Sequence, residues 1–425
     1  MTRYTAAWVL PISAPPLAGG CVTVEHGRIA AVGHRTGADA IDLGRVAVLP
    51  ALVNAHTHLE LSYLHGRVPR ADRFLDWVRV LMATRRDYPD PDAPIIVEAA
   101  RAALVVARAA GTGLLGEVAN TLVTAPLLRE ARMPARVFYE LIGFTTPDPQ
   151  GRIDAARERV RQAGIESEDV RVSLAPHAPY SVSPELFAGI RADLDARPGQ
   201  VSSVHLGESP EEVEFLREGT GGWRTLLEEI GAWNPEWQAP GTTPVEYLEG
   251  LGFLDSRVLA VHGVQCSGED LDLIGSLGVT VVACPRSNRY VGVGAPPIEA
   301  FYAMDVNVAF GTDSLASVED LNLFAELAEA RRLAPRVSAR ALLESATLVG
   351  ARALGFGAEY GSLEPGKRAA LIAVRLPEGV QDVEEYLVSG IQPDAISWLD
   401  SENPKSQNPK PKSARPDRHC VDCEL

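Results

Sequence analysis

The sequence predicts an α/β protein: a (β/α)8 TIM barrel with a small flanking β-sandwich domain made from both chain ends. Three observations support this prediction. Strand-like and helix-like segments alternate from residue 49 to 357. The strand-like segments are mostly continuous apolar runs, as expected for parallel strands buried on both faces. Shorter β patterns flank this region at residues 1–48 and 358–392, and we expect them to form the two parts of the sandwich.

The first elements are short β segments. CVTVEHGRIAAVG (21–33) alternates apolar and polar positions across a glycine turn, the pattern of a half-buried hairpin. VAVLPALVNAHTH (46–58) then changes character, because it is continuously apolar until its polar C-terminal end. We expect this run to be the first strand of the barrel.

Seven later segments complete the predicted set of eight strands. They are GLLGEV, ARVFYELIG, VRVSLAPHAP, QVSSVHLGE, RVLAVHGVQ, VTVVACPRSN and VNVAFGTDS. Helical stretches with apolar residues at a spacing of three to four lie between several of them, including APIIVEAARAALVVARAAG, PEEVEFLREG and DLNLFAELAEARRLA. A barrel of this type carries its active site at the C-terminal tips of the strands.

Two segments do not follow the alternation. Residues 219–244 have weak periodicity and hold three of the six tryptophans, so they form either a lid over the barrel mouth or a packed surface excursion. Residues 400–425 are rich in Pro, Lys and Ser and are predicted to be disordered. The HCVDC run in this tail resembles half of a zinc site, and we interpret it as incidental.

Composition excludes several classes of partner. A net charge of -16 argues against nucleic-acid and anionic membrane surfaces, which need clustered positive charge. Five scattered cysteines imply no disulfide framework, and no apolar run approaches the roughly 20 residues of a membrane helix. The first residues make a poor signal peptide. We therefore expect a cytoplasmic protein that acts on a small molecule, with a homodimer as one arrangement left open.

Polar residues gather at the predicted strand tips. His56 and His58 are two residues apart at the end of a buried strand, so both side chains face the barrel axis and can share one divalent metal. His205, His262 and Asp313 end other strands. With His177, five of the nine histidines lie at strand ends on one face, which scattered structural histidines would not do. For any single one, a core histidine bonded to the backbone is the alternative.

The chain resembles the amidohydrolase superfamily up to about residue 390. The matching motifs are PALVNAHTHLELS, SSVHLGESPEE, AVHGVQ, ACPRSN, GTDSLAS and GSLEPGKRAALIAV. The resemblance implies that His56, His58, His205 and Asp313 bind a metal and that His262 contacts the metal-bound water or the substrate. Binuclear members bridge two metals through a Lys or carboxylate on the fourth strand, and VRVSLAPHAP has neither. One Zn²⁺ is therefore expected, with Fe²⁺ and Mn²⁺ as alternatives.

Glu208 lies three residues after His205, and this His-x-x-Glu spacing marks the branch of the superfamily that deaminates nucleobases and related heterocycles. By this resemblance, Glu208 protonates the ring nitrogen beside the reacting carbon. Asp313 takes the proton of the attacking water and passes it to ammonia, and His262 orients the attack. The alternative for Glu208 is an acidic residue that stabilises the first turn of the following helix.

Within the superfamily, HTHLELSYLHG, FLDWVRVLMATRR and CPRSNRYVG are most similar to the bacterial aminodeoxyfutalosine deaminases of menaquinone biosynthesis. Adenosine, S-adenosylhomocysteine and methylthioadenosine deaminases are alternatives, as are a chlorohydrolase of triazine-type rings and a non-catalytic binding protein. Arg85 or Arg86 stands where riboside deaminases often carry a Glu, and an Arg suits a substrate carboxylate, although both could be solvated helix-end charges. The remaining candidate substrate-binding residues are His177, Arg286, Ser287, Asn288, Arg289 and Ser314.

Overall fold

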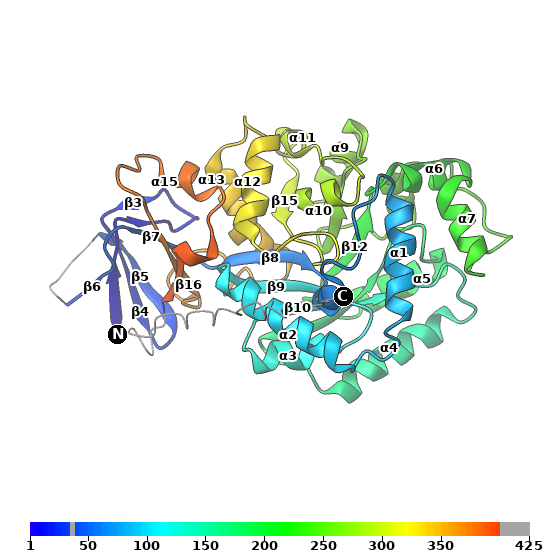
Figure 1. The fold of residues 1–425 in the computed structure, drawn as a ribbon, viewed down its shortest axis with the longest axis horizontal. Helices are drawn as coiled ribbons and strands as arrows, with labels where there is room; N and C mark the ends of the chain where they lie inside the picture. The colour runs from blue at the N-terminus through cyan, green and yellow to red at the C-terminus, as the bar shows by residue number, and fades with distance from the viewer. Residues whose placement is uncertain (35–38, 400–425) are drawn as a thin grey trace, which may run out of the picture.

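The computed structural model describes residues 1–34 and 39–399. Its centre consists of two four-stranded parallel sheets, seen between the surrounding helices in Figure 1. The first has the order β11-β10-β9-β8 and the second the order β12-β13-β14-β15. Their bounds are Leu52–Thr57 (β8), Thr112–Ala119 (β9), Ala135–Leu141 (β10), Val170–Pro176 (β11), Ser202–Leu206 (β12), Val258–His262 (β13), Thr280–Ala283 (β14) and Asn307–Phe310 (β15). Each predicted strand segment thus contains a strand.

Isolated contacts join the edges of the two sheets. At one edge, the backbone amides of Thr312 and Asp313 both donate to the carbonyl of His56 over 3.1 Å. At the other, the amide of His205 donates to the carbonyl of His177 over 2.9 Å. The parallel α/β architecture is as predicted, but the strands do not form one continuous closed ladder. A Cβ on Gly311 would lie 2.7 Å from that of His56, so the first edge requires glycine there.

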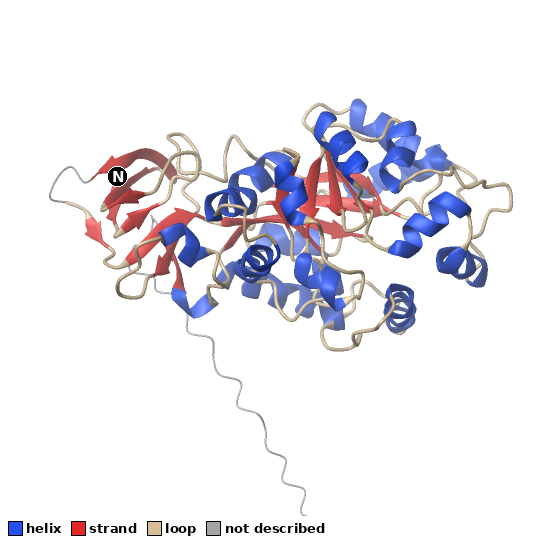
Figure 2. Cartoon of the chain, turned by 90° about the horizontal axis from the view of Figure 1, so that it is seen from above, coloured by secondary structure: helices blue, strands red, loops and turns tan. Residues whose placement is uncertain are grey.

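Helices cover the outside of these sheets, as the blue helices around the red strands of Figure 2 show. Several begin at residues that favour a helix start: Ser183, Ser209, Thr243 and Ser267 each accept a backbone N–H three residues on. The helices are α1 (Phe74–Arg86), α2 (Pro94–Ala109), α3 (Thr124–Glu130), α4 (Pro149–Ala163), α5 (Pro184–Asp195), α6 (Pro210–Glu218), α7 (Gly221–Glu229), α8 (Pro244–Gly250), α9 (Gly268–Ser276), α10 (Pro285–Tyr290), α11 (Ile298–Ala303), α12 (Leu323–Leu333), α13 (Ala339–Glu344), α14 (Gly350–Ala353) and α15 (Val383–Leu387).

Two further sheets lie outside the central ones, the first made of N-terminal strands alone and the second of strands from both ends of the chain. One has the order β5-β4-β1-β6, and its β4 (Gly20–Glu25) and β5 (Arg28–His34) form the predicted antiparallel hairpin. The other has the order β17-β16-β7-β2-β3. The two sheets share one hydrophobic cluster that includes Tyr4, Val22, Val48 and Leu371; the sandwich itself stays a prediction. The remaining bounds are β1 (Thr2–Thr5), β2 (Trp8–Val9), β3 (Leu17–Ala18), β6 (Ile41–Asp42), β7 (Val46–Pro50), β16 (Leu371–Arg375) and β17 (Ile396–Leu399).

The apolar run at residues 46–58 is two strands instead of the predicted single strand. β7 pairs with β16 and β2, whereas β8 pairs with β9 in the central sheet. Ala51 lies between them and donates its amide to the carbonyl of Ala370 over 2.9 Å. Both strands are almost fully buried, so hydrophobicity alone carries no signal for the change of sheet.

The tryptophan-rich segment contains helix α7, and its aromatic side chains are packed. Trp223 stacks on Tyr180 with ring centroids 3.7 Å apart, and Trp237 stacks on Phe215 at 4.7 Å. The contacts support the packed alternative over a free lid. The HCVDC run lies outside the described residues. Among the residues that are described, no helix combines the length and apolarity needed to cross a membrane.

Candidate metal and substrate site

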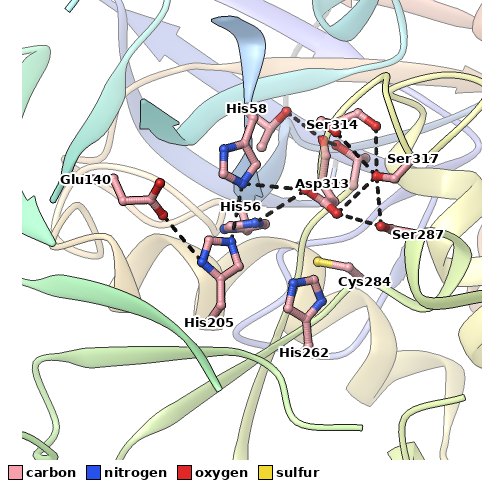
Figure 3. A network of polar contacts seen from close by, with 12 residues as sticks. His56, His58, Glu140, His205, His262, Cys284, Ser287, Asp313, Ser314 and Ser317 are labelled. Atoms are coloured by element: carbon pink, nitrogen blue, oxygen red, sulfur yellow. Dashed lines mark hydrogen bonds and ion pairs between the residues drawn. The ribbon is translucent and has the colours of Figure 1, made fainter. Parts of the chain in front are cut away.

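Four predicted ligands meet where the parallel strands end (Figure 3). His56 lies on β8, and His58 precedes the 3₁₀ helix Leu59–Leu64 that follows it. His205 lies on β12, and Asp313 comes three residues after the end of β15. Asp313 has a φ of 61°, a left-handed conformation that non-glycine residues adopt mainly under local constraint. The parallel topology thus brings residues 257 positions apart to one edge.

The distances within this group suit a single cation. Nε2 of His56 and Nε2 of His58 lie 3.7 and 3.6 Å from Oδ1 of Asp313. Nε2 of His205 lies 3.4 Å from Nε2 of His58. Four atoms held tetrahedrally at the usual zinc-ligand lengths are about 3.3 Å apart. We call His56, His58 and His205 the histidine cluster; one ligand atom from each lies within 4.8 Å of the others.

His56 gives an independent indication of a bound ion. Its side chain is fully buried, and neither ring nitrogen has a hydrogen-bond partner among the described residues. Buried polar atoms in proteins are nearly always bonded, because an unpaired one carries the whole desolvation cost. A metal ion between the histidine cluster and Asp313 would accept a lone pair from His56. These four residues therefore fit a bound metal ion.

Burial sets the charges of these side chains. Burial lowers the pKa of His58 well below its ordinary value and that of His205 to about 4, so both imidazoles are neutral and present lone pairs. Burial alone would raise the pKa of Asp313, but the neighbouring imidazoles of His56 and His58 hold it well below its usual range. Neutral imidazoles around one carboxylate are typical of a catalytic zinc site.

Two hydroxyls fix the orientation of Asp313. Ser287 Oγ donates to Oδ2 over 2.5 Å, and Ser317 Oγ donates to the same oxygen over 3.0 Å. Figure 3 shows the other oxygen, Oδ1, turned towards the histidines. Because both hydroxyls donate to Oδ2, Oδ1 remains available as a metal ligand or as a proton acceptor. Ser287 was predicted to border the substrate, and the structure places its hydroxyl on Asp313.

Glu208 and His262 lie together beside this group. Nε2 of His262 is 3.6 Å from Oε1 of Glu208, and both side chains are buried. Burial, and then the nearby carboxylates of Asp313 and Glu212, raise the pKa of Glu208 well above its ordinary value. The raised pKa favours the protonated form of Glu208, the form that can donate a proton. It precedes the N-cap Ser209, so it lies outside the first turn of α6.

His205 has two further neighbours that sequence reasoning missed or assigned differently. Nδ1 of His205 lies 3.0 Å from the carbonyl of His177 and 3.4 Å from Oε1 of Glu140. Glu140 on β10 is buried and accepts a 2.7 Å hydrogen bond from Nδ2 of Asn120. Acceptors on the second nitrogen of a metal-binding histidine fix its tautomer. An acidic residue near the end of an apolar strand is the signal that could have identified Glu140.

The predicted substrate-binding residues fall into two groups. Arg85 borders a cavity of about 210 Å³ with Glu60, Tyr63 and Tyr88, and its Nη1 donates to Oδ1 of Asn120 over 3.1 Å. His177 contacts the site through His205, and the Ser314 side chain is buried beside Asp313. Asn288 is turned to His262. His177 and Ser314 therefore lie beside the histidine cluster and Asp313, and Asn288 lies beside His262. Arg85 borders a cavity whose lining includes no residue of the cluster.

The other predicted residues are directed elsewhere. Nη1 of Arg286 pairs with Asp320 at 2.8 Å, and its other contacts are Glu319 and Glu326. Arg289 pairs with Glu329 at 2.8 Å on an exposed surface. Arg86 is exposed at the end of α1. The structure does not bring these three guanidinium groups to the histidine cluster.

Comparison with known proteins is consistent with this geometry. A family model described as "Amidohydrolase family" matches residues 47–406. The aminodeoxyfutalosine deaminase of Deinococcus radiodurans is 33% identical over 79% of this chain and 81% of its own. The 5-methylthioadenosine/S-adenosylhomocysteine deaminase of Moorella thermoacetica is 31% identical over 89% of this chain and 88% of its own. An adenosine deaminase of Xanthomonas campestris, solved with bound zinc, is 27% identical with a TM-score of 0.80, covering 93% of this chain and 90% of that one.

Proposed function

The chain belongs to the amidohydrolase family and is a hydrolytic deaminase, and we propose that it removes the 6-amino group from an adenine-type nucleoside. The observation that carries the proposal is the buried Glu208, with a raised pKa and 3.6 Å from His262, beside the histidine cluster and Asp313. A protonated carboxyl next to a metal site is what acid catalysis on a ring nitrogen requires. Simple binding does not need it.

We propose that His56, His58, His205 and Asp313 hold one Zn²⁺ per chain, with Fe²⁺ and Mn²⁺ as alternatives. The three imidazoles and one carboxylate support this assignment, because zinc favours nitrogen ligands and low coordination numbers. When bound, such an ion acts as a Lewis acid that makes water a usable nucleophile near neutral pH.

The chain's own residues then move the protons. Asp313, an ionised carboxylate, accepts the proton of the attacking water and later gives it to the departing ammonia. Glu208 donates its proton to the ring nitrogen beside the reacting carbon, which makes that carbon more electrophilic. The proton that the added hydroxyl loses when the carbonyl forms returns Glu208 to its protonated form. His262 is neutral because burial lowers its pKa well below the ordinary value, so it orients the attack without adding a charge.

For the substrate, we infer that Arg85 contacts a carboxylate at the end remote from the base. Arg85 is partly exposed in a cavity whose other walls include Leu61, Tyr63, Tyr88 and Ile96, and its Nη2 lies 3.6 Å from Oε1 of Glu60. A substrate carboxylate would therefore share the guanidinium with Glu60, with apolar and aromatic walls around it. This supports 6-amino-6-deoxyfutalosine as substrate and futalosine and ammonia as products, a step of menaquinone biosynthesis. Adenosine, S-adenosylhomocysteine or methylthioadenosine is the alternative that the similarity of the named relatives also supports.

A panel of substrates tests the proposal. Release of ammonia is measured for aminodeoxyfutalosine, adenosine, methylthioadenosine and S-adenosylhomocysteine, and release of chloride for a chlorotriazine. The proposal requires ammonia release with the highest kcat/KM for aminodeoxyfutalosine. Activity confined to adenosine would refute that substrate, and chloride release without ammonia release would refute the deaminase proposal as a whole.

The closed barrel and the flanking sandwich remain proposals. We infer that the two parallel sheets are the halves of one (β/α)8 barrel of residues 49–357, because amide and hydroxyl donors join both pairs of edges. Residues 1–48 and 358–392 are then the flanking sandwich. A cytoplasmic location and a homodimer stay predictions.

A further inference from the structure

Glu212, on the first turn of α6, holds the backbone of Glu208 directly. Oε1 of Glu212 accepts the amide of Gly207 over 3.0 Å, and Oε2 accepts the amide of Glu208 over 2.9 Å. The Glu212 side chain is fully buried, with no cation paired with it among the described residues. Both oxygens of a buried carboxylate are thus committed to two consecutive amides, one of them that of the proposed acid catalyst.

This contact reaches beyond ordinary helix capping. In the capping boxes of α8 and α9, Glu246 and Asp270 accept the amide of the N-cap residue itself. Glu212 stands at the same position of α6, whose N-cap is Ser209. Its two shortest hydrogen bonds go to the two residues before the N-cap, and the amide of the N-cap Ser209 also faces its carboxylate. The carboxylate therefore fixes the loop between β12 and α6 in addition to the helix start.

The carbonyl groups of the same loop are fixed from the other side. The amide of Gln265 donates to the carbonyl of Gly207 over 2.8 Å, and Nε2 of Gln265 lies 3.4 Å from the carbonyl of Glu208. Gly207 has a φ of 62°, so the loop depends on a left-handed turn that another residue would strain. The amides and carbonyls of Gly207 and Glu208 all have hydrogen-bond partners. The backbone from which the Glu208 side chain extends is therefore held in place.

We propose that Glu212 is a positioning residue that holds Glu208 at the distance and angle needed for proton transfer. The proposal rests on the proposed function of Glu208 as acid catalyst. Proton transfer requires heavy atoms about 2.6–3.2 Å apart, and a displacement of about 1 Å at a reacting group costs about 100-fold in rate. A shift of the loop would therefore reduce turnover while the histidine cluster remained intact.

Glu212→Gln is the informative variant, because it keeps the size of the side chain. Its NH₂ group would face one of the two backbone amides, so one hydrogen bond becomes a contact between two donors. We expect kcat to fall about 10- to 100-fold, with KM and zinc content unchanged. Glu246→Gln, which alters a capping box remote from the site, is the matched control and should leave kcat unchanged.

A double-mutant cycle on the zinc-loaded full chain tests the proposal. Ammonia release is measured for the parent, Glu208→Gln, Glu212→Gln and the double variant, with melting temperatures and zinc content measured in parallel. If Glu212 acts through Glu208, Glu212→Gln lowers kcat in the parent but causes no further loss in the Glu208→Gln background. Equal losses in both backgrounds, or an unchanged kcat in Glu212→Gln, would overturn the proposal.

The arms of the cycle separate two kinds of failure. Near-normal turnover of Glu208→Gln would refute the proposed function, and the positioning role would fall with it. A large loss in Glu208→Gln with normal turnover in Glu212→Gln would refute the positioning role alone. If Glu212→Gln does not fold, Glu212→Asp replaces it: the shorter carboxylate reaches one amide, so kcat should lie between the parent and Glu208→Gln, and parental kcat would contradict the proposal.

Discussion

Nδ2 of Asn288 donates a hydrogen bond to Nδ1 of His262 over 3.0 Å. Because Nδ1 of this neutral imidazole is an acceptor, the ring proton is on Nε2, the nitrogen that lies 3.6 Å from Glu208. His262, the last residue of β13, has a φ of 81°, a left-handed conformation that non-glycine residues rarely adopt. A residue on α10 thus sets the tautomer of a residue on β13, and we expect turnover to depend on that pairing.

Asn288→Asp should reverse this tautomer. The new carboxylate accepts a proton from Nδ1, so Nε2 loses its proton and faces the site as an acceptor. We expect kcat to fall by about 100-fold or more, because wrong tautomers in comparable sites cost up to about 10⁴-fold. Steady-state ammonia release and zinc content check the prediction; a parental kcat with bound zinc would contradict it.

Removal of the metal should destabilise the fold as well as abolish activity. Without an ion, both nitrogens of the buried His56 lack a hydrogen-bond partner among the described residues. A ligand that binds the native state alone stabilises it by mass action, so chelation should lower the melting temperature and added Zn²⁺ should restore it. Calorimetry with and without chelator measures this. An unchanged melting temperature after verified metal loss would contradict the assigned ligands.

The free energy of unfolding should depend on pH through Glu326, which is in contact with Arg286. Burial raises the pKa of Glu326 from 4.5 to about 8, against the opposing effect of Arg286. A raised carboxyl pKa means that this contribution to the free energy of unfolding is fully present below pH 4.5 and is lost as the pH rises through about 8. Glu326→Gln should therefore show a smaller loss of stability between these values in urea unfolding. The same change in the free energy of unfolding with pH in both proteins would contradict the prediction.

Arg85 should determine the affinity for a carboxylate-bearing substrate. Loss of a charge-assisted hydrogen bond of this type costs about 1.5–3 kcal/mol, so Arg85→Ala should raise KM for aminodeoxyfutalosine about 10- to 100-fold. KM for adenosine, which has no carboxylate, should change little. Arg86→Ala is the matched comparison, since Arg86 is exposed beside it. Equal effects of the two variants on both substrates would argue against the assigned contact.

Much of this site could be predicted because its ligands follow buried strands. The tips of parallel strands converge, so His56, His205 and Asp313 could be grouped without knowledge of any distance. Glu140 and Glu212 were not identified from the sequence, and Asn288 was assigned to the substrate although its side chain contacts His262. Their contacts depend on how the chain folds around them. The boundary at Ala51 was missed because the run on either side of it is equally apolar.

Arg286 illustrates a further limit of sequence reasoning. It lies beside Ser287 and Asn288, which both contact site residues, and it was expected to bind the substrate. Its guanidinium instead pairs with Asp320 and Glu319. Adjacent helical side chains point in different directions, so proximity in sequence to Ser287 did not determine where Arg286 points.

Turnover of zinc-loaded Glu208→Gln is the most direct test of the central claim that Glu208 is the acid catalyst. The amide keeps the size of the side chain but has no acidic proton to give to the ring nitrogen. The account predicts zinc content equal to that of the parent and a loss in kcat of about 10²- to 10⁴-fold. Near-normal ammonia release with zinc bound would contradict it.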